Sequence, residues 1–220
     1  LISKYPGSSP DLVFQQGALA FLKKDYSLAQ KLFREAARRA SETTAENALF
    51  NENLAALNAN DASGAAALIK EAAGSSRLRE SILFEQAHYA AKRMAPQAAE
   101  LLANFITLAE TPALKTQARL DQVEVALNLN PPDLETVQAI LPLLEKEQLS
   151  PEQTMQLARL NILEEESRQE WPSAIQSCRR AIALDSEGKQ ADMLYLKLGE
   201  LLYKNGDFHE AQLVLQPFPS

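Results

Sequence analysis

Apolar residues recur at helical spacing along the whole chain, and small clusters of helix-breaking residues interrupt them about every 12 to 20 residues. Near the start, Leu19, Leu22 and Leu28 fall on such a spacing, and the same pattern continues to the end of the chain. No stretch shows the strict alternation of a strand. Several of the breakers place a proline where the first turn of the next helix begins. The pattern predicts an all-α fold of about twelve helices joined by short turns, paired as about six helical hairpins.

Composition agrees with a folded helical protein and makes two classes of partner unfavourable. Hydrophobic residues form 46% of the chain, charged residues 23%, and glycine is rare, with 7 among 220 residues. The net charge of −7 gives the chain no general attraction for nucleic acid or for anionic lipid. No apolar stretch approaches the roughly 18 residues that span a bilayer. We therefore expect neither nucleic-acid binding nor membrane insertion by this segment.

Comparing the first and last hairpins shows an internal repeat. The first contains Gly17, an Asp25-Tyr26 turn and then Ala29, and the last contains Gly199, a Gly206-Asp207-Phe208 turn and then Ala211. In both, the glycine precedes the alanine by 12 residues. Two helices approach closely only where small residues face the partner, and a bulky residue one turn later fills the space beside them.

This arrangement of small residues and turn resembles the tetratricopeptide (TPR) repeat family. The resemblance is specific in the first and last units and weaker between them, where Ala65, Ala98 and Ala174 keep the small position. It implies a single α-solenoid over residues 1–220 with a right-handed superhelical path, and a segment of a longer repeat array. The expected repeats cover about 10–43, 44–76, 77–112, 113–149, 150–187 and 188–220.

No group of residues has the spacing of a catalytic, metal or cofactor site. His88 and His209 lie far apart and outside any metal-ligand motif. Cys178, the one cysteine, occupies a bulky core position of its repeat, where a thiol is inert. Consecutive carboxylates such as those of residues 164–166 point about 100° apart on a helix and do not converge on a cation. We expect no enzyme activity, no cofactor and no metal.

The resemblance implies that the first helix of each hairpin lines a concave groove that binds protein. Asn51 and Asn58 lie seven residues apart on one helix face, where paired amides could hold a peptide backbone. Each aromatic or leucine candidate has the alternative role of packing between helices. The candidates for the groove are Phe14, Phe21, Phe50, Asn51, Leu54, Asn58, His88, Lys92, Lys197, Glu200 and Tyr203.

The sequence thus favours a scaffold or adaptor that binds a peptide or a partner helix, and two other functions stay open. One is a structural spacer of a bacterial envelope assembly, in secretion or polysaccharide export, that associates with itself. The other is the sensor domain of a regulator. The Tyr5-Pro6-Gly7-Ser8 turn is similar to turns of bacterial envelope TPR proteins and favours a periplasmic or envelope location over a cytoplasmic one. The partner and the oligomeric state do not follow from the sequence.

Overall fold

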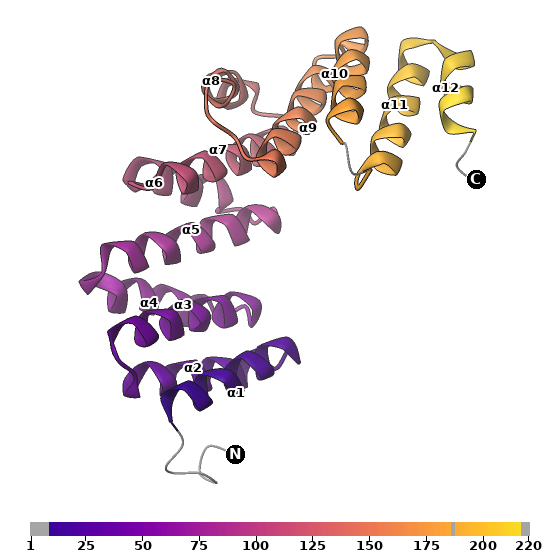
Figure 1. Ribbon diagram of the computed structural model, residues 1–220. Coiled ribbons are helices and arrows are strands. Elements are labelled where there is room, and N and C mark those ends of the chain that lie inside the picture. The colour runs from indigo at the N-terminus through magenta and orange to yellow at the C-terminus, as the bar shows by residue number, and fades with distance from the viewer. Residues whose placement is uncertain (1–8, 186–187, 217–220) are drawn as a thin grey trace. The chain divides into compact units, whose positions relative to one another are not determined.

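The computed structural model describes residues 9–185 and 188–216, and throughout this part of the chain it is helical, with no strand (Figure 1). Twelve α-helices and one short 3₁₀-helix lie within the described residues, so the all-α prediction is confirmed. None of these helices is long and apolar enough to cross a membrane. The Tyr5–Ser8 turn, on which the envelope location depends, lies outside the described residues.

The chain divides into two compact units, 1–111 and 112–220. This division falls one residue from the predicted boundary between the third and fourth repeats. The first unit contains α1 (Pro10–Leu22), α2 (Tyr26–Arg39), α3 (Glu42–Asn58), α4 (Ala62–Glu71), η2 (Ala72–Gly74), α5 (Ser76–Lys92) and α6 (Ala98–Leu108). The second contains α7 (Pro112–Leu127), α8 (Leu134–Leu144), α9 (Pro151–Ser167), α10 (Trp171–Leu184), α11 (Ala191–Asn205) and α12 (Phe208–Leu215).

Within each unit, helices pack mainly on their neighbours in the sequence. In the first unit, α2 contacts both α1 and α3, and α5 contacts α4 and α6. In the second, α10 packs against α9 and α11, and α11 packs against α12. Each interface contains small buried residues, among them Ala36 and Ala48 in the first unit and Ala181 in the second.

Five of the turns that connect paired helices share one hydrogen-bond pattern. In each, a residue with positive φ ends the first helix, and the N–H of the next residue donates to a carbonyl five residues earlier, which is a Schellman motif. The positive-φ residues are Lys24, Asn60, Met94, Gln169 and Gly206, with φ of 62°, 57°, 49°, 60° and 91°. The bonds run from Asp25 to Ala20, Asp61 to Ala56, Ala95 to Ala90, Glu170 to Glu165 and Asp207 to Leu202, each 2.9 Å long.

The turn between α7 and α8 is a longer version of the same connection. The N–H of Asp133 donates to the carbonyl of Ala126, seven residues earlier, at 3.0 Å. Pro131 and Pro132 occupy the added length. Asp133 then caps α8 by accepting from the N–H of Thr136 at 3.1 Å, as Asp25 and Asp61 cap α2 and α4.

A small or short residue follows each of these turns and is fully packed. In five turns this residue stands four positions after the acidic residue of the turn. The five residues are at most 4% exposed: Ala29, Ala65, Val137, Ala174 and Ala211. In the third pair the buried Ala98 stands three residues after Ala95, so the repeat register shifts there by one residue. This one-residue difference is one reason why the sequence pattern is weaker there than in the first and last units.

The glycines of the first and last pairs permit close helix contact. A Cβ atom at Gly17 would lie 2.9 Å from the ring of Phe33, and one at Gly199 would lie 2.4 Å from Cγ of Leu215. These contacts bring together the small residue and the bulky residue that the repeat pattern predicts as neighbours. Thr43 and Thr44 lie in the first turn of α3, which begins at Glu42.

Ala29→Leu and Ala211→Leu are each expected to destabilise the chain by about 1–3 kcal/mol, because both alanines are buried in close helix contacts and the added methylenes overpack them. Urea denaturation followed by circular dichroism measures the effect. Ala66→Leu is the matched control, since Ala66 is exposed on α4. Equal midpoints for all three variants and the wild type would contradict the packing described above.

Candidate interaction site on α9 and α11

An apolar pocket opens between the first helices of the last two pairs. Its walls are Ile162 and Leu163 of α9 and Met193 and Leu194 of α11, with Arg159 and Lys197 at its edge. Its volume is about 100 Å³. That is below the roughly 300–1,000 Å³ of small-molecule sites, so the pocket suits one apolar side chain of a larger partner.

The local sequence explains how α9 and α11 are held. A capping box, in which Ser150 and Gln153 exchange side-chain and backbone hydrogen bonds, fixes the start of α9. Beneath both helices, α10 contributes the buried Ala174, Cys178 and Ala181. The thiol of Cys178 donates to the carbonyl of Leu194 on α11 at 3.3 Å.

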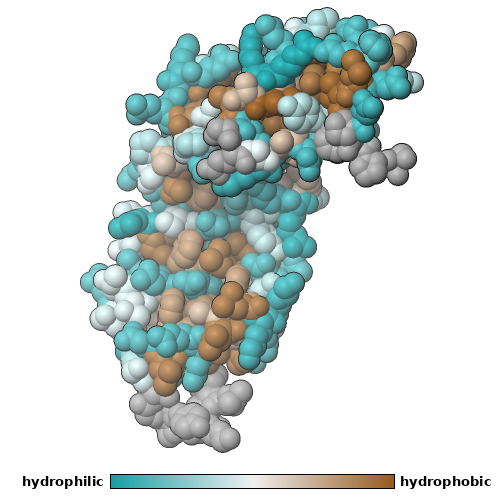
Figure 2. All heavy atoms as spheres, turned by 45° about the vertical axis from the view of Figure 1, so that its right-hand side comes forward, coloured by the Kyte–Doolittle hydropathy of each residue, from teal (hydrophilic) through white to brown (hydrophobic). Residues whose placement is uncertain are grey.

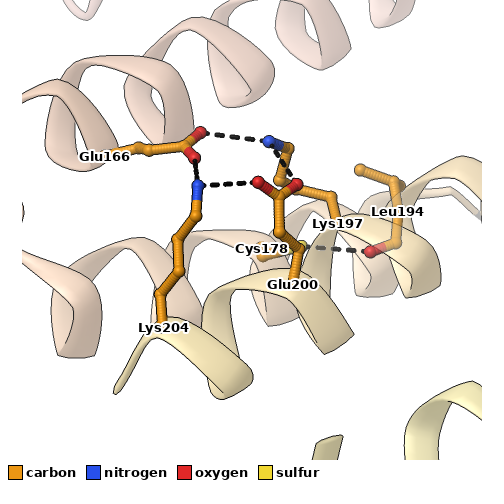
Figure 3. A network of polar contacts seen from close by, with 6 residues as sticks. All are labelled: Glu166, Cys178, Leu194, Lys197, Glu200 and Lys204. Atoms are coloured by element: carbon orange, nitrogen blue, oxygen red, sulfur yellow. Dashed lines mark hydrogen bonds and ion pairs between the residues drawn. The ribbon is translucent and has the colours of Figure 1, made fainter. Parts of the chain in front are cut away.

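Beside the pocket, four charged side chains of alternating sign form a closed ring (Figure 3). Glu166 of α9 accepts from Lys197 at 3.1 Å and from Lys204 at 2.6 Å. On α11, Glu200 accepts from the same two lysines, at 2.9 Å and 2.7 Å. The ring therefore links the two helices and carries no net charge.

The ring shifts the pKa values of Lys197, Glu200 and Lys204 in the direction that favours their charged forms. Hydrogen bonds from Lys204 and Lys197 lower the pKa of Glu200. Burial acts to lower the pKa of Lys197, but its bonds to Glu200 and Glu166 outweigh burial and raise it. The bonds to Glu166 and Glu200 likewise raise the pKa of Lys204. Partly exposed ion pairs add little stability, so the main effect of the ring is to fix the side chains beside the pocket.

Cys178 lies under this face and is fully buried, as the sequence predicts. Burial raises the pKa of its thiol to about 11, although the nearby Lys197 acts to lower it. Because the thiolate is the reactive form, Cys178 serves as a packing residue at neutral pH.

Three of the predicted groove residues, Lys197, Glu200 and Tyr203, lie on α11. Lys197 and Glu200 belong to the ring. Tyr203 is 65% exposed and its ring packs edge-on against Phe208, with 5.2 Å between centroids. Phe21 and Tyr26 make the same contact in the first pair, again at 5.2 Å.

The predicted aromatic residues of the first unit serve mainly to pack its helices. Phe14 lies 5.3 Å from Phe33, centroid to centroid, within the first pair. Phe50 is half-buried against the cluster that contains Leu68 and Ile82, and Leu54 is half-buried on the same helix.

The predicted polar residues of the first unit are half-buried, except for Lys92. The amide groups of Asn51 and Asn58 donate to carbonyls of their own helix, those of Asn47 and Leu54, both at 2.8 Å. His88 is half-buried and stacks on Phe84 with 5.4 Å between ring centroids, and Lys92 is exposed one turn later.

Sequence reasoning missed the α9 side of the pocket and its ring. Arg159, Ile162 and Leu163 are ordinary helical residues in the sequence, and Glu166 was interpreted as part of a solvated face. The three consecutive carboxylates do point to different partners: Glu164 pairs with Arg168, Glu165 accepts from Ser177, and Glu166 joins the ring. The i,i+3 and i,i+4 spacing of Lys197, Glu200 and Lys204 was the one available signal.

Apolar side chains reach the surface of both units among hydrophilic ones (Figure 2). On α11 these include Met193 at 43% exposed and Leu196 at 48%.

No protein-family model matches this chain, and no curated protein or solved structure is similar enough to count as a match.

Proposed function

We propose that the chain is a TPR-like α-solenoid that binds a peptide or a partner helix on the face formed by the first helices of its pairs. The observation that carries this proposal is the open apolar pocket between α9 and α11. Apolar surface exposed at a concave site favours burial by a partner, and the neighbouring ring of charges holds the pocket walls in place.

The solenoid itself is part of the proposal. Repeated Schellman turns and the small residue buried after each turn support it, as does packing between sequence neighbours. In such an array, each pair covers the apolar face of the next, and the first helices line one continuous surface. A pocket of about 100 Å³ holds a single side chain, so stable binding needs a wider contact, on the order of 1,200 Å² in total.

The proposal is tested by affinity capture with the wild-type chain and two variants. Met193→Glu places a charge at the pocket. Leu143→Glu is its matched control on α8, since Leu143 and Met193 are 45% and 43% exposed. Partners are identified by mass spectrometry, purified and titrated against all three chains, whose helicity is checked by circular dichroism.

We expect Met193→Glu to weaken binding of a purified partner at least tenfold and Leu143→Glu to leave it unchanged. Equal affinities for the two variants would place binding elsewhere. Capture of nothing but the chain itself, with self-association in sedimentation experiments, would favour the structural spacer of an envelope assembly over the adaptor. Neither alternative function, spacer or regulator sensor, is favoured by a particular contact in the described residues.

A further inference from the structure

A larger pocket lies in the first unit, between its second and third helix pairs. It is about 370 Å³ in volume and opens beside the α3–α4 and α5–α6 turns. Leu57, Ala65, Ala90 and Leu101 give it an apolar part, and the polar residues that line it include Asp61, Tyr89 and Arg93. The volume is within the range of ligand sites and admits two or three side chains.

The repeat explains why this pocket is open. Between the first and second pairs, the corresponding interval is bridged by a side-chain bond, in which Gln30 of α2 donates to Asp61 of the α3–α4 turn at 3.1 Å. Ala29 and Ala65 occupy the same buried position in the first and second pairs. The residue that follows each is therefore equivalent, Gln30 in the first pair and Ala66 in the second. Asp61 corresponds to Ala95, since both donate their N–H to a carbonyl five residues earlier. Two alanines thus replace the hydrogen-bonded pair.

The electrostatics of the pocket favour an anionic group. Arg93 donates to the hydroxyl of Tyr89 at 2.8 Å and its guanidinium lies 5.2 Å from the centre of that ring. No carboxylate of the described residues forms an ion pair with Arg93. A guanidinium has five N–H donors, so the bond to Tyr89 leaves donors of Arg93 for a further group.

Asp61 is the acidic residue that lines the same pocket, and its oxygens are already engaged. They accept from the N–H of Gly64 at 2.9 Å, from the hydroxyl of Ser63 at 2.9 Å and from Gln30. These bonds lower the pKa of Asp61 and direct its charge toward the start of α4. The oxygens of Asp61 are thus engaged, whereas Arg93 contacts Tyr89 and no carboxylate within the described residues.

We propose that this pocket is a second docking site, which binds an aspartate or glutamate side chain flanked by small apolar residues in an extended segment of a partner protein. The carboxylate pairs with Arg93 in the bidentate manner that a guanidinium favours, and the apolar neighbours cover Leu57, Ala90 and Leu101. The site uses the turn edge of the first unit. It is therefore independent of the α9–α11 face and of the function proposed for it.

Selection of a displayed random dodecapeptide library on the full 220-residue chain tests this site. We expect enriched peptides to share an acidic residue next to Ala, Val or Ile. One enriched peptide is then synthesised and titrated against four chains: wild type, Arg93→Glu, Arg77→Glu and Ala66→Gln/Ala95→Asp. Arg77 is an exposed arginine at the opposite end of α5 and is the matched control.

Arg93→Glu is expected to weaken binding at least tenfold and Arg77→Glu to leave it unchanged. The double variant restores the bond seen between Gln30 and Asp61, so it closes the pocket. It should lose binding as fully as Arg93→Glu while its melting temperature stays at or above that of the wild type. Selection without acidic enrichment, or equal affinity for the four chains, would overturn the site. The Met193→Glu variant is also titrated with the peptide. We expect it to bind the peptide with wild-type affinity, which would show that this site is separate from the α9–α11 face.

Discussion

Replacing Phe33 by alanine is expected to lower the free energy of unfolding by about 3–5 kcal/mol. Phe33 is 1% exposed, and its ring lies directly over Gly17 and beside the ring of Phe14. Because Gly17 has no side chain that could move into the space, the cavity left by the ring stays open. Urea denaturation of the full chain, followed by circular dichroism, measures the loss.

Phe208→Ala is the control for this experiment, since the Phe208 ring also contacts another aromatic ring but is 59% exposed. We expect it to cost less than about 1 kcal/mol. A size exchange tests the geometry further: Gly17→Leu should be destabilising alone and should recover part of the loss when combined with Phe33→Ala. A loss for Phe33→Ala no greater than for Phe208→Ala would show that the ring does not fill this contact.

Replacing Arg34 should cause the second largest loss of stability among the predicted substitutions, because it leaves a buried carboxylate without its cation. Arg34 of α2 donates to Glu52 of α3 through Nε at 2.8 Å and also bonds Glu71. The side chain of Glu52 is 8% exposed and its second oxygen has no hydrogen-bond partner. We expect Arg34→Leu to destabilise by about 2–4 kcal/mol, below the roughly 3–5 kcal/mol of a fully buried pair, because Arg34 is 26% exposed.

The effect of Arg34→Leu should depend on pH in a defined direction. Burial raises the pKa of Glu52 above its ordinary value of 4.5, and the charge of Arg34 opposes this. A carboxyl with a raised pKa in the folded state contributes stability when protonated and loses it as pH rises through the folded pKa. Without Arg34 that pKa rises further. The destabilisation should therefore be smaller at pH 4.5 than at pH 8.

Denaturation of three chains at both pH values tests this prediction. The chains are the wild type, Arg34→Leu and Arg34→Leu/Glu52→Gln. Because the glutamine removes the buried charge, the double variant should recover most of the stability lost at pH 8 and should lose the pH dependence. Glu71→Gln is the control: Glu71 is 42% exposed, and exposed pairs contribute at most about 1 kcal/mol. A loss for Arg34→Leu that is the same at both pH values would exclude a buried charge as its cause.

Most of the helices follow from the sequence because their causes are local. Prolines and capping residues mark the starts of helices such as α9, where Ser150 and Pro151 stand together. The burial of Ala29 and Ala211 follows from repeat spacing, since a small residue at a fixed distance from a turn points at the preceding helix. The register of the third repeat could not be predicted, because Ala95 lacks the acidic side chain that marks the other turns.

The interaction sites were predictable only in part, because they depend on residues that are distant in sequence. On α11 the repeat resemblance, which places the first helix of each hairpin in the groove, pointed to Lys197 and Glu200. Nothing local links them to Glu166, which is 31 residues from Lys197. The pocket beside Arg93 depends on two missing side chains, and an alanine in a helical sequence gives no sign that it replaces a hydrogen bond.

The packing of each helix on its sequence neighbours also bears on how the chain folds. The main contacts within each unit join helices that are adjacent or one helix apart in the sequence. Loops that must close before such contacts form are short, so the entropy lost before the first stabilising contact is small. Contacts between sequence neighbours favour fast folding, which limits the time during which apolar helix faces are exposed to aggregation.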